Sequence, residues 1–298
     1  MEVRNIIFIF APFNEAYEYK TKRMNIKYLY WCVLLLAVIG VGGYSYLYFR
    51  WRHLWALDPP RQAYQILRHQ DDTLRVVMIG DSWAGMHRPF DDFMQAQLQK
   101  LSADLVLFES KGKGGEKTKG VYQLMFEKSG YGTKSFIACS PDYCIISAGI
   151  NDAAANLGEK QYCYYYCQIV ELLLNNHIKP VVLDFPDVNM WTIYQEKPFK
   201  NLCSDFMRSM MTHCGMYDYS GYREALKSIL EKNGLMDSVL YIPICEWYGA
   251  SYEVNFDLFL EDQIHLNSRG YKLLDICLAR NIAKDYNNRR MPHLSISQ

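Results

Sequence analysis

Apolar residues follow two different patterns along this chain of 298 residues. The first is a single uncharged run, YLYWCVLLLAVIGVGGYSYLYF, which occupies residues 28–49. Its length matches the roughly 20 residues that a helix needs to cross the hydrocarbon core of a bilayer. Tyrosine and tryptophan residues stand near both ends of the run, where amphipathic rings suit the level of the lipid headgroups. The run is therefore interpreted as one uncleaved membrane-spanning helix.

Two alternatives to this anchor are a buried core helix and a cleaved signal peptide. A core helix seldom extends this far without a polar residue, and no A-x-A-like cleavage site follows the run. Four basic residues lie in the ten positions before the run and two in the ten after it, which favours a cytoplasmic N-terminus. The rest of the chain would then be extracytoplasmic, in a periplasm or at a cell surface. Met24 offers an alternative start to Met1, because a short basic segment then directly precedes the run.

The second pattern begins after residue 72, where short β-branched runs alternate with segments of helical spacing. This alternation predicts an α/β fold in which helices cover both faces of a parallel sheet. The predicted organisation is a tail (1–27), an anchor (28–49), a connector (50–72) that is helical after Pro59-Pro60, and one domain (73–298). Strands are expected at residues 74–79, 105–108, 143–147, 180–185 and 239–244, and helices at 92–101, 121–126, 162–175, 199–211, 222–233 and 267–282.

Composition and charge exclude several classes of protein. The chain has 32 basic and 32 acidic residues, and it is 50% hydrophobic, which is the opposite of the composition of disordered proteins. No run of lysine and arginine marks a nucleic-acid-binding surface, so no nucleic-acid partner is expected. None of the nine cysteines has C-x-x-C or zinc-finger spacing, which argues against a structural metal. Cys203 and Cys214 are the pair most easily joined in an exported domain, and buried reduced thiols are the alternative.

Four short polar motifs lie where the predicted strands end or just before the last predicted helix. In open α/β sheets, ligands bind at the carboxyl ends of the strands. Each motif alone is typical of a turn or a helix N-cap, whereas the set together predicts an active site. A serine at a strand-to-helix turn suits a nucleophile that also helps to bind an oxyanion. The motifs are Gly80-Asp81-Ser82-Trp83, a turn with Gly112, Gly114 and Gly115, Gly149-Ile150-Asn151-Asp152, and Asp262-Gln263-Ile264-His265.

These four motifs together resemble those of the SGNH/GDSL hydrolases, which are serine esterases with a flavodoxin-like three-layer α/β/α fold. The resemblance extends from residue 74 to residue 282 and implies a catalytic triad and an oxyanion hole. The triad is Ser82 as nucleophile, His265 as base and Asp262 as its orienting partner. The oxyanion donors are the Ser82 N–H, the Gly115 N–H and the Asn151 side-chain amide, with Gly112 and Gly114 as alternatives to Gly115. Trp83 departs from the family pattern, in which leucine is common at this position.

The resemblance implies hydrolysis of an ester through an acyl-serine intermediate, without a metal or an organic cofactor. Together with the anchor, it indicates O-acetyl groups on a cell-envelope or environmental carbohydrate as the substrate. The alternatives are an O-acyltransferase with the same triad, a lipid esterase or thioesterase, and an inactive module that binds glycans. Residues 187–199 are long enough to form a rim or lid, and His87, His177 and His213 are expected at the surface or at helix ends. The sequence leaves the oligomeric state open.

Overall fold

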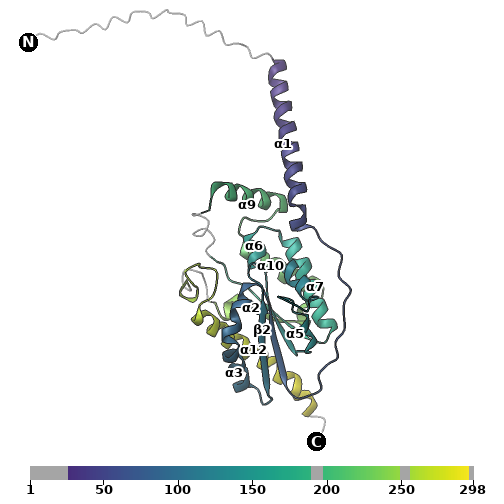
Figure 1. Ribbon diagram of the computed structural model, residues 1–298, viewed down its shortest axis with the longest axis vertical. Helices are drawn as coiled ribbons and strands as arrows, with labels where there is room; N and C mark the ends of the chain where they lie inside the picture. The colour runs from purple at the N-terminus through teal and green to yellow at the C-terminus, as the bar shows by residue number, and fades with distance from the viewer. Residues whose placement is uncertain (1–25, 189–196, 249–255, 295–298) are drawn as a thin grey trace, which may run out of the picture. The chain divides into compact units, whose positions relative to one another are not determined.

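The computed structural model describes residues 26–188, 197–248 and 256–294 (Figure 1). The chain divides into two units, Met1–Arg52 and His53–Gln298. Most of the predicted tail, with both candidate start residues, lies outside the described residues. Residues 189–196 of the predicted rim or lid also lie outside them.

The first unit contains helix α1 (Ile26–Trp55), which includes the predicted anchor. From Tyr28 to Trp55 this helix is long and apolar enough to cross a membrane, and its apolar window is not buried in protein. In this it differs from the core helix of a soluble domain, which is mostly buried. Its position near the N-terminus and its composition fit both a membrane anchor and a signal sequence.

A five-stranded sheet forms the centre of the second unit, and all its strands are parallel. The strands are β1 (Leu74–Gly80), β2 (Val106–Gly112), β3 (Tyr143–Ser147), β4 (Lys179–Leu183) and β5 (Leu240–Ile242). Their order is β2-β1-β3-β4-β5, which is the flavodoxin-like order and confirms the predicted fold class. Strand β2 continues to Gly112, four residues further than expected. As an edge strand it alternates buried and more exposed residues, so it lacks the continuous apolar run of a central strand.

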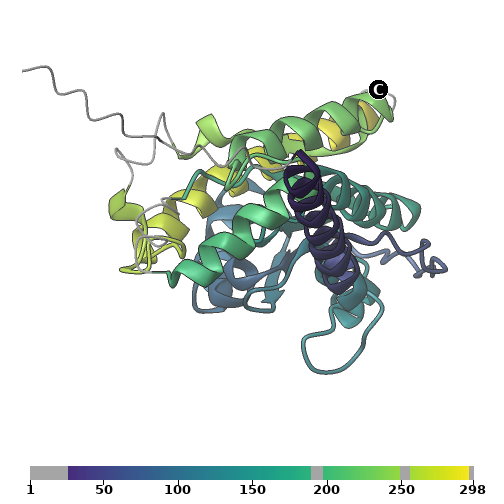
Figure 2. The same ribbon diagram turned by 90° about the horizontal axis from the view of Figure 1, so that it is seen from above.

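Helices cover the sheet in two groups (Figure 1, Figure 2). Helix α3 packs on α12, while α4 and α10 both pack on α7. Right-handed connections between parallel strands place these groups on opposite faces of the sheet. The helices are α2 (Ser82–His87), α3 (Asp91–Leu101), α4 (Thr118–Leu124), α5 (Lys134–Ala138), α6 (Ile150–Ala154), α7 (Glu159–Asn175), α9 (Phe199–Thr212), α10 (Tyr219–Lys232) and α12 (Ser268–Leu294). Short 3₁₀ turns lie at Arg88–Phe90, Met236–Ser238, Ile244–Glu246 and Phe256–Leu258.

The connector after α1 is an extended segment, called here the strap and defined as residues 56–69. It contains no helix, so the prediction of a helix after Pro59-Pro60 is wrong. The Asp58 N–H donates to the Tyr165 hydroxyl near the start of α7, at 2.9 Å. The Ile66 N–H donates to Asn176 Oδ1 at the end of the same helix, also at 2.9 Å. The strap stays extended because side chains of the domain satisfy its backbone polar groups, in place of an internal helical ladder.

The structure corrects the expectation that His87 lies at the surface. Its side chain is completely buried between two carboxylates, with Nδ1 at 2.9 Å from Asp91 Oδ1 and Nε2 at 2.7 Å from Asp275 Oδ1. Asp91 also accepts hydrogen bonds from the backbone and hydroxyl of Ser110. Burial lowers the pKa of His87, but the hydrogen bonds and charges of Asp275 and Asp91 outweigh it and raise the pKa to about 9. The cluster joins α2, α3, β2 and α12.

The other sequence expectations for histidine and cysteine have clear outcomes. His177 and His213 are exposed and lie at helix ends, as expected: His213 directly follows α9, and His177 is two residues after the end of α7. All nine cysteines are free, so the disulfide considered between Cys203 and Cys214 is not formed. Cys203 is exposed, whereas Cys214 is buried.

Replacing His87 with alanine is expected to lower the free energy of unfolding by about 3–5 kcal/mol, because Asp275 would remain buried without its partner. Urea unfolding of the full-length chain in detergent, followed by near-UV circular dichroism, measures this loss. The folded-state pKa is raised to about 9. The stabilisation is therefore fully present below the unfolded value of roughly 6.5, and it is lost as the pH rises through the folded value.

The matched control for this prediction is alanine at the exposed His53, which should leave the unfolding free energy unchanged. Equal stability of the two variants would contradict the role assigned to the buried cluster.

Candidate active site

Ser82 is the first residue of α2, directly beyond the end of β1. The carboxylate of Asp81 caps this helix by accepting the Trp83 N–H at 3.0 Å. Gly80 permits the close approach of β1 to β3, since a Cβ atom there would lie 1.9 Å from the Ser147 carbonyl oxygen. The Ser82 side chain is thus held at a fixed strand-to-helix turn, and the residue is 9% exposed.

Asp81 links this turn to the third motif. Its Oδ1 accepts the Ser147 hydroxyl at 3.2 Å, and its Oδ2 lies 3.3 Å from Asn151 Nδ2. Burial raises the pKa of Asp81 to about 6, against the opposing effects of the hydrogen bonds from the Trp83 N–H and the Ser147 hydroxyl and of the charge of His265. The fourth motif lies near the first, because the Ile264 carbonyl accepts a hydrogen bond from the Trp83 side chain.

The fourth motif forms a compact histidine–aspartate pair. His265 Nδ1 lies 2.6 Å from Asp262 Oδ2, while Asp262 Oδ1 accepts the backbone N–H groups of Ile264 and His265, each at 3.0 Å. Burial raises the pKa of Asp262, but these hydrogen bonds outweigh it and lower the pKa below its usual value. The ionised carboxylate orients the imidazole. Within the described ranges His265 Nε2 makes no hydrogen bond, so it can accept a proton.

Trp83 ties the histidine loop to the helix of Ser82. Its indole Nε1–H donates to the Ile264 carbonyl at 3.1 Å, and its own carbonyl accepts the Tyr271 hydroxyl at 3.1 Å. Trp247 packs edge-on against the indole ring, with the ring centroids 6.0 Å apart. The residue that departs from the family pattern is therefore a structural link between the first and fourth motifs, a role that leucine could not fill.

The three glycines of the second motif occupy different positions. Gly112 lies in β2 against the first motif, where a Cβ atom would be 2.1 Å from the Asp81 carbonyl oxygen. Gly114 and Gly115 follow in the turn, and Gly115 has a left-handed φ of 70° with open space around its Cα. The next carbonyl, that of Glu116, accepts Asn151 Nδ2 at 3.0 Å. Gly115 is thus adjacent to a residue in contact with Asn151, whereas Gly112 serves the packing of α2 on β2.

Asp152 is a structural residue that the sequence analysis left without a role. Its Oδ2 accepts both the N–H and the hydroxyl of Thr118, each at 2.9 Å, and so holds the start of α4 against the third motif. Burial is the largest effect on its carboxyl and raises the pKa to about 7. The Asn-Asp pair of the third motif therefore has two uses: Asn151 faces the second motif's turn and Asp152 fixes the helix that follows it.

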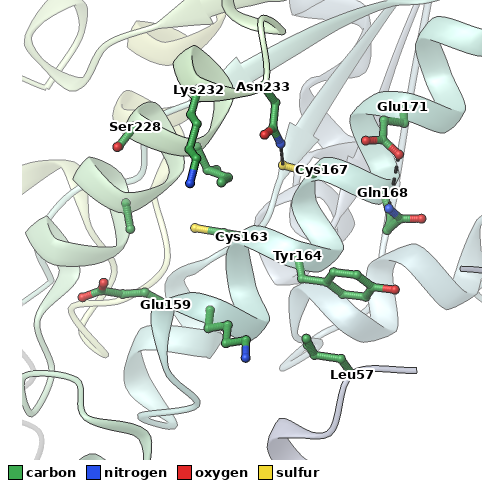
Figure 3. A pocket seen from close by; sticks show the side chains of 13 residues that line it. Leu57, Glu159, Cys163, Tyr164, Cys167, Gln168, Glu171, Ser228, Lys232 and Asn233 are labelled. Atoms are coloured by element: carbon green, nitrogen blue, oxygen red, sulfur yellow. Dashed lines mark hydrogen bonds between the residues drawn. The ribbon is translucent and has the colours of Figure 1, made fainter. Parts of the chain in front are cut away.

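A groove of about 600 Å³ lies between α7 and α10 and includes none of the motif residues in its lining (Figure 3). Cys163 and Cys167 project into it, and burial raises their pKa values to about 12 and about 11. Both are therefore protonated thiols at neutral pH and not nucleophiles. In the part of the chain that the structure describes, no group of three or more His, Cys, Asp or Glu residues is placed to hold a metal ion.

Comparison with known proteins places the four motifs in one family region. The sequence model of the GDSL-like lipase/acylhydrolase family matches residues 78–273, which include all four. A lipase/acylhydrolase from Enterococcus faecalis is similar in structure, with a TM-score of 0.51 and 14% identity over 71% of this chain and 96% of that one. A GDSL-like lipase from Bacteroides thetaiotaomicron has a TM-score of 0.50 and 17% identity over 71% and 89% of the two chains. No curated protein matches the sequence.

Replacing Asp262 with asparagine is expected to slow the reaction of Ser82 with a fluorophosphonate by roughly 10³–10⁴-fold, because the imidazole loses the partner that sets its tautomer. The rate of covalent labelling, followed by intact mass spectrometry, measures the effect. Asp257→Asn is the control, since Asp257 is an exposed carboxylate in the same loop region that pairs with Arg269. The assignment of Asp262 would be refuted if both variants were labelled at the wild-type rate.

Proposed function

The chain belongs to the GDSL-like lipase/acylhydrolase family and is an ester-hydrolysing enzyme, and we propose that Ser82, His265 and Asp262 are its catalytic triad. The observation that carries this proposal is the 2.6 Å pair of His265 and Asp262, whose loop is bound through Trp83 to the helix that begins at Ser82. A nucleophile, a base and an orienting carboxylate are the parts that acyl transfer to serine requires.

The reaction follows from these groups. His265 Nε2 takes the proton of the Ser82 hydroxyl as Oγ attacks the ester carbonyl carbon, and Asp262 stabilises the imidazolium. The tetrahedral intermediate then collapses and the alcohol leaves with the proton from His265. Water attacks the acyl-serine with His265 again as base, which releases the carboxylic acid and restores Ser82.

The negative oxygen of the tetrahedral intermediate needs hydrogen-bond donors placed before the reaction. The N–H groups of Ser82 and Gly115 and Nδ2 of Asn151 fill this role. Asn151 Nδ2 is shared between the Glu116 carbonyl at 3.0 Å and the Asp81 carboxylate at a longer 3.3 Å. The longer contact is the weaker one, so the N–H directed at Asp81 is the one available to the oxyanion, while the shorter bond keeps the amide in place.

The substrate is an O-acetyl group on a carbohydrate of the cell envelope or the environment. Support comes from α1, which is long and apolar enough to hold the domain at a membrane. The domain lies on the extracytoplasmic side, because more basic residues precede the apolar run than follow it within ten positions. A domain held there meets acylated surface carbohydrates. The ordered His265–Asp262 pair argues against an inactive glycan-binding module.

Ser82→Ala is expected to abolish hydrolysis of p-nitrophenyl acetate, because no other group can form the acyl intermediate at this site. Ser228→Ala is the control, since Ser228 borders the groove between α7 and α10 and should leave the rate unchanged. Release of p-nitrophenolate by the full-length chain in detergent measures both. Wild-type activity in the Ser82 variant would rule out the proposed nucleophile.

The same pair of variants tests the substrate. The wild type and Ser228→Ala should release acetate from at least one of acetylated xylan, O-acetylated peptidoglycan and acetylated capsular polysaccharide, whereas Ser82→Ala should not. If the wild type hydrolyses p-nitrophenyl acetate but releases acetate from none of the three polysaccharides, the carbohydrate assignment is contradicted. The assignment of the triad is unaffected by that result.

A further inference from the structure

Helix α9 exposes large apolar side chains to the outside and buries polar ones against the protein. An apolar stripe, defined as Phe199, Cys203, Phe206 and Met210, follows spacings of four, three and four residues and so lies on one side of the helix. Phe199, Phe206 and Met210 are 80%, 54% and 55% exposed. Asp205 and Ser209 are the buried residues of the same helix, and Leu202 on that side is partly buried against the core. This is the reverse of the pattern of a surface helix that packs on a hydrophobic core.

Polar contacts hold α9 in this orientation. The Asp205 carboxylate accepts the Tyr217 hydroxyl at 2.7 Å and Lys197 Nζ at 3.0 Å, and it pairs with Arg208. The Ser209 hydroxyl donates to the Cys214 carbonyl at 2.6 Å. Because the inner side is fixed by hydrogen bonds, the helix cannot bury its apolar stripe by rotating without breaking them.

Helix α9 lies at the edge of the sheet where the catalytic motifs stand, called here the catalytic edge. The Thr212 hydroxyl at its C-terminus donates to the Asn156 carbonyl at 3.2 Å, five residues after Asn151. Figure 1 shows α9 beside α6, the helix of the third motif. The exposed apolar stripe and the candidate active site therefore share one end of the domain.

The strap also begins at the catalytic edge. The Ala56 carbonyl accepts Lys119 Nζ and the Tyr165 hydroxyl, each at 3.3 Å. Lys119 is three residues from Glu116, whose carbonyl binds Asn151. Ala56 comes seven positions after Phe49, which is the end of the apolar run. In a helix these span about 10 Å, so the catalytic edge is the part of the domain tied closest to the end of the apolar run.

From these features we propose that α9 lies in the interface of the membrane that α1 crosses. Phe199, Phe206 and Met210 enter the boundary between headgroups and acyl chains, as in amphipathic helices that lie on a bilayer. The catalytic edge then faces the membrane, and the ester that it hydrolyses is carried by a molecule attached to that membrane. The bilayer is the occupant of the stripe because the chain's own anchor holds this edge beside it. The inference on the substrate rests on the proposed function.

Two native cysteines allow a direct test. Cys203 belongs to the apolar stripe, while the exposed Cys139 lies at the opposite edge of the sheet, where its carbonyl binds Arg75 at the start of β1. Full-length chains that keep only one of the exposed cysteines are labelled with the fluorophore NBD and placed in phosphatidylcholine vesicles. A nitroxide on the lipid should quench the label at Cys203 by at least about two-fold more than the label at Cys139.

Phe206→Gln/Met210→Gln should abolish the difference in quenching. Leu101→Gln/Leu105→Gln is the matched control and should preserve it. These leucines are also exposed, at 46% and 63%, but they lie at the end of α3 and directly before β2. Equal quenching at Cys203 and Cys139 in the wild type would overturn the proposal. A label at Cys203 that is shielded from water but is not quenched by the lipid nitroxide would also overturn the proposal. The stripe would then be covered by protein.

The substrate is tested with two esters of one chromophore. Phe206→Gln/Met210→Gln should leave hydrolysis of soluble acetyl-umbelliferone unchanged and slow hydrolysis of the same ester on a vesicle-bound diacyl lipid by about five-fold or more, because the interfacial contact is lost. Equal effects on both esters would overturn the inference. Failure of the wild type on the soluble ester would contradict the proposed function alone, since the quenching result does not depend on activity.

Discussion

The buried carboxylate of Asp81 is the interaction on which the geometry of the site depends. It caps the helix of Ser82, accepts the hydroxyl at the end of β3 and contacts the amide of Asn151. One side chain thus holds together two segments far apart in the sequence, the turn of Ser82 and the segment from Ser147 to Asn151. This is possible because β1, β2 and β3 end in register, with Gly80 opposite both Gly112 and Ser147. Two glycines at this level remove the side chains that would separate the strand ends.

Helix α2 is short, and its position is set by contacts at both of its ends. Asp81 fixes the first turn, and at the last residue His87 joins two carboxylates from α3 and α12. Trp83 adds a lateral contact to the loop of the histidine–aspartate pair. A helix of six residues has little stability of its own, so its tertiary contacts decide its position. The precision of the site therefore comes from buried polar bonds around a short element.

Much of the fold was predictable because central parallel strands are buried on both faces. β3 has the expected bounds, and β1 extends one residue past the expected run, since both are continuous apolar segments. The end of β2 was not predictable in this way, because Glu109 and Lys111 interrupt the apolar run at the sheet edge. The role of His87 could not be predicted either, since its partner Asp275 lies 188 residues away. The four motifs were found because their chemistry is local, whereas the contacts that orient them are not.

The strap changes what counts as the folded unit of this protein. It follows α7 from its first turns to the residue after its end, Asn176, which both accepts the Ile66 N–H and donates to the Tyr64 carbonyl. The Tyr122 hydroxyl also accepts the Arg61 N–H at 2.9 Å, so Tyr122, Tyr165 and Asn176 all form hydrogen bonds with a segment that has no regular secondary structure. If α1 were removed by proteolytic processing, the strap would become the new N-terminal segment, and it would already be hydrogen-bonded along α7. The same fold could therefore exist as a tethered or as a free protein without rebuilding its core.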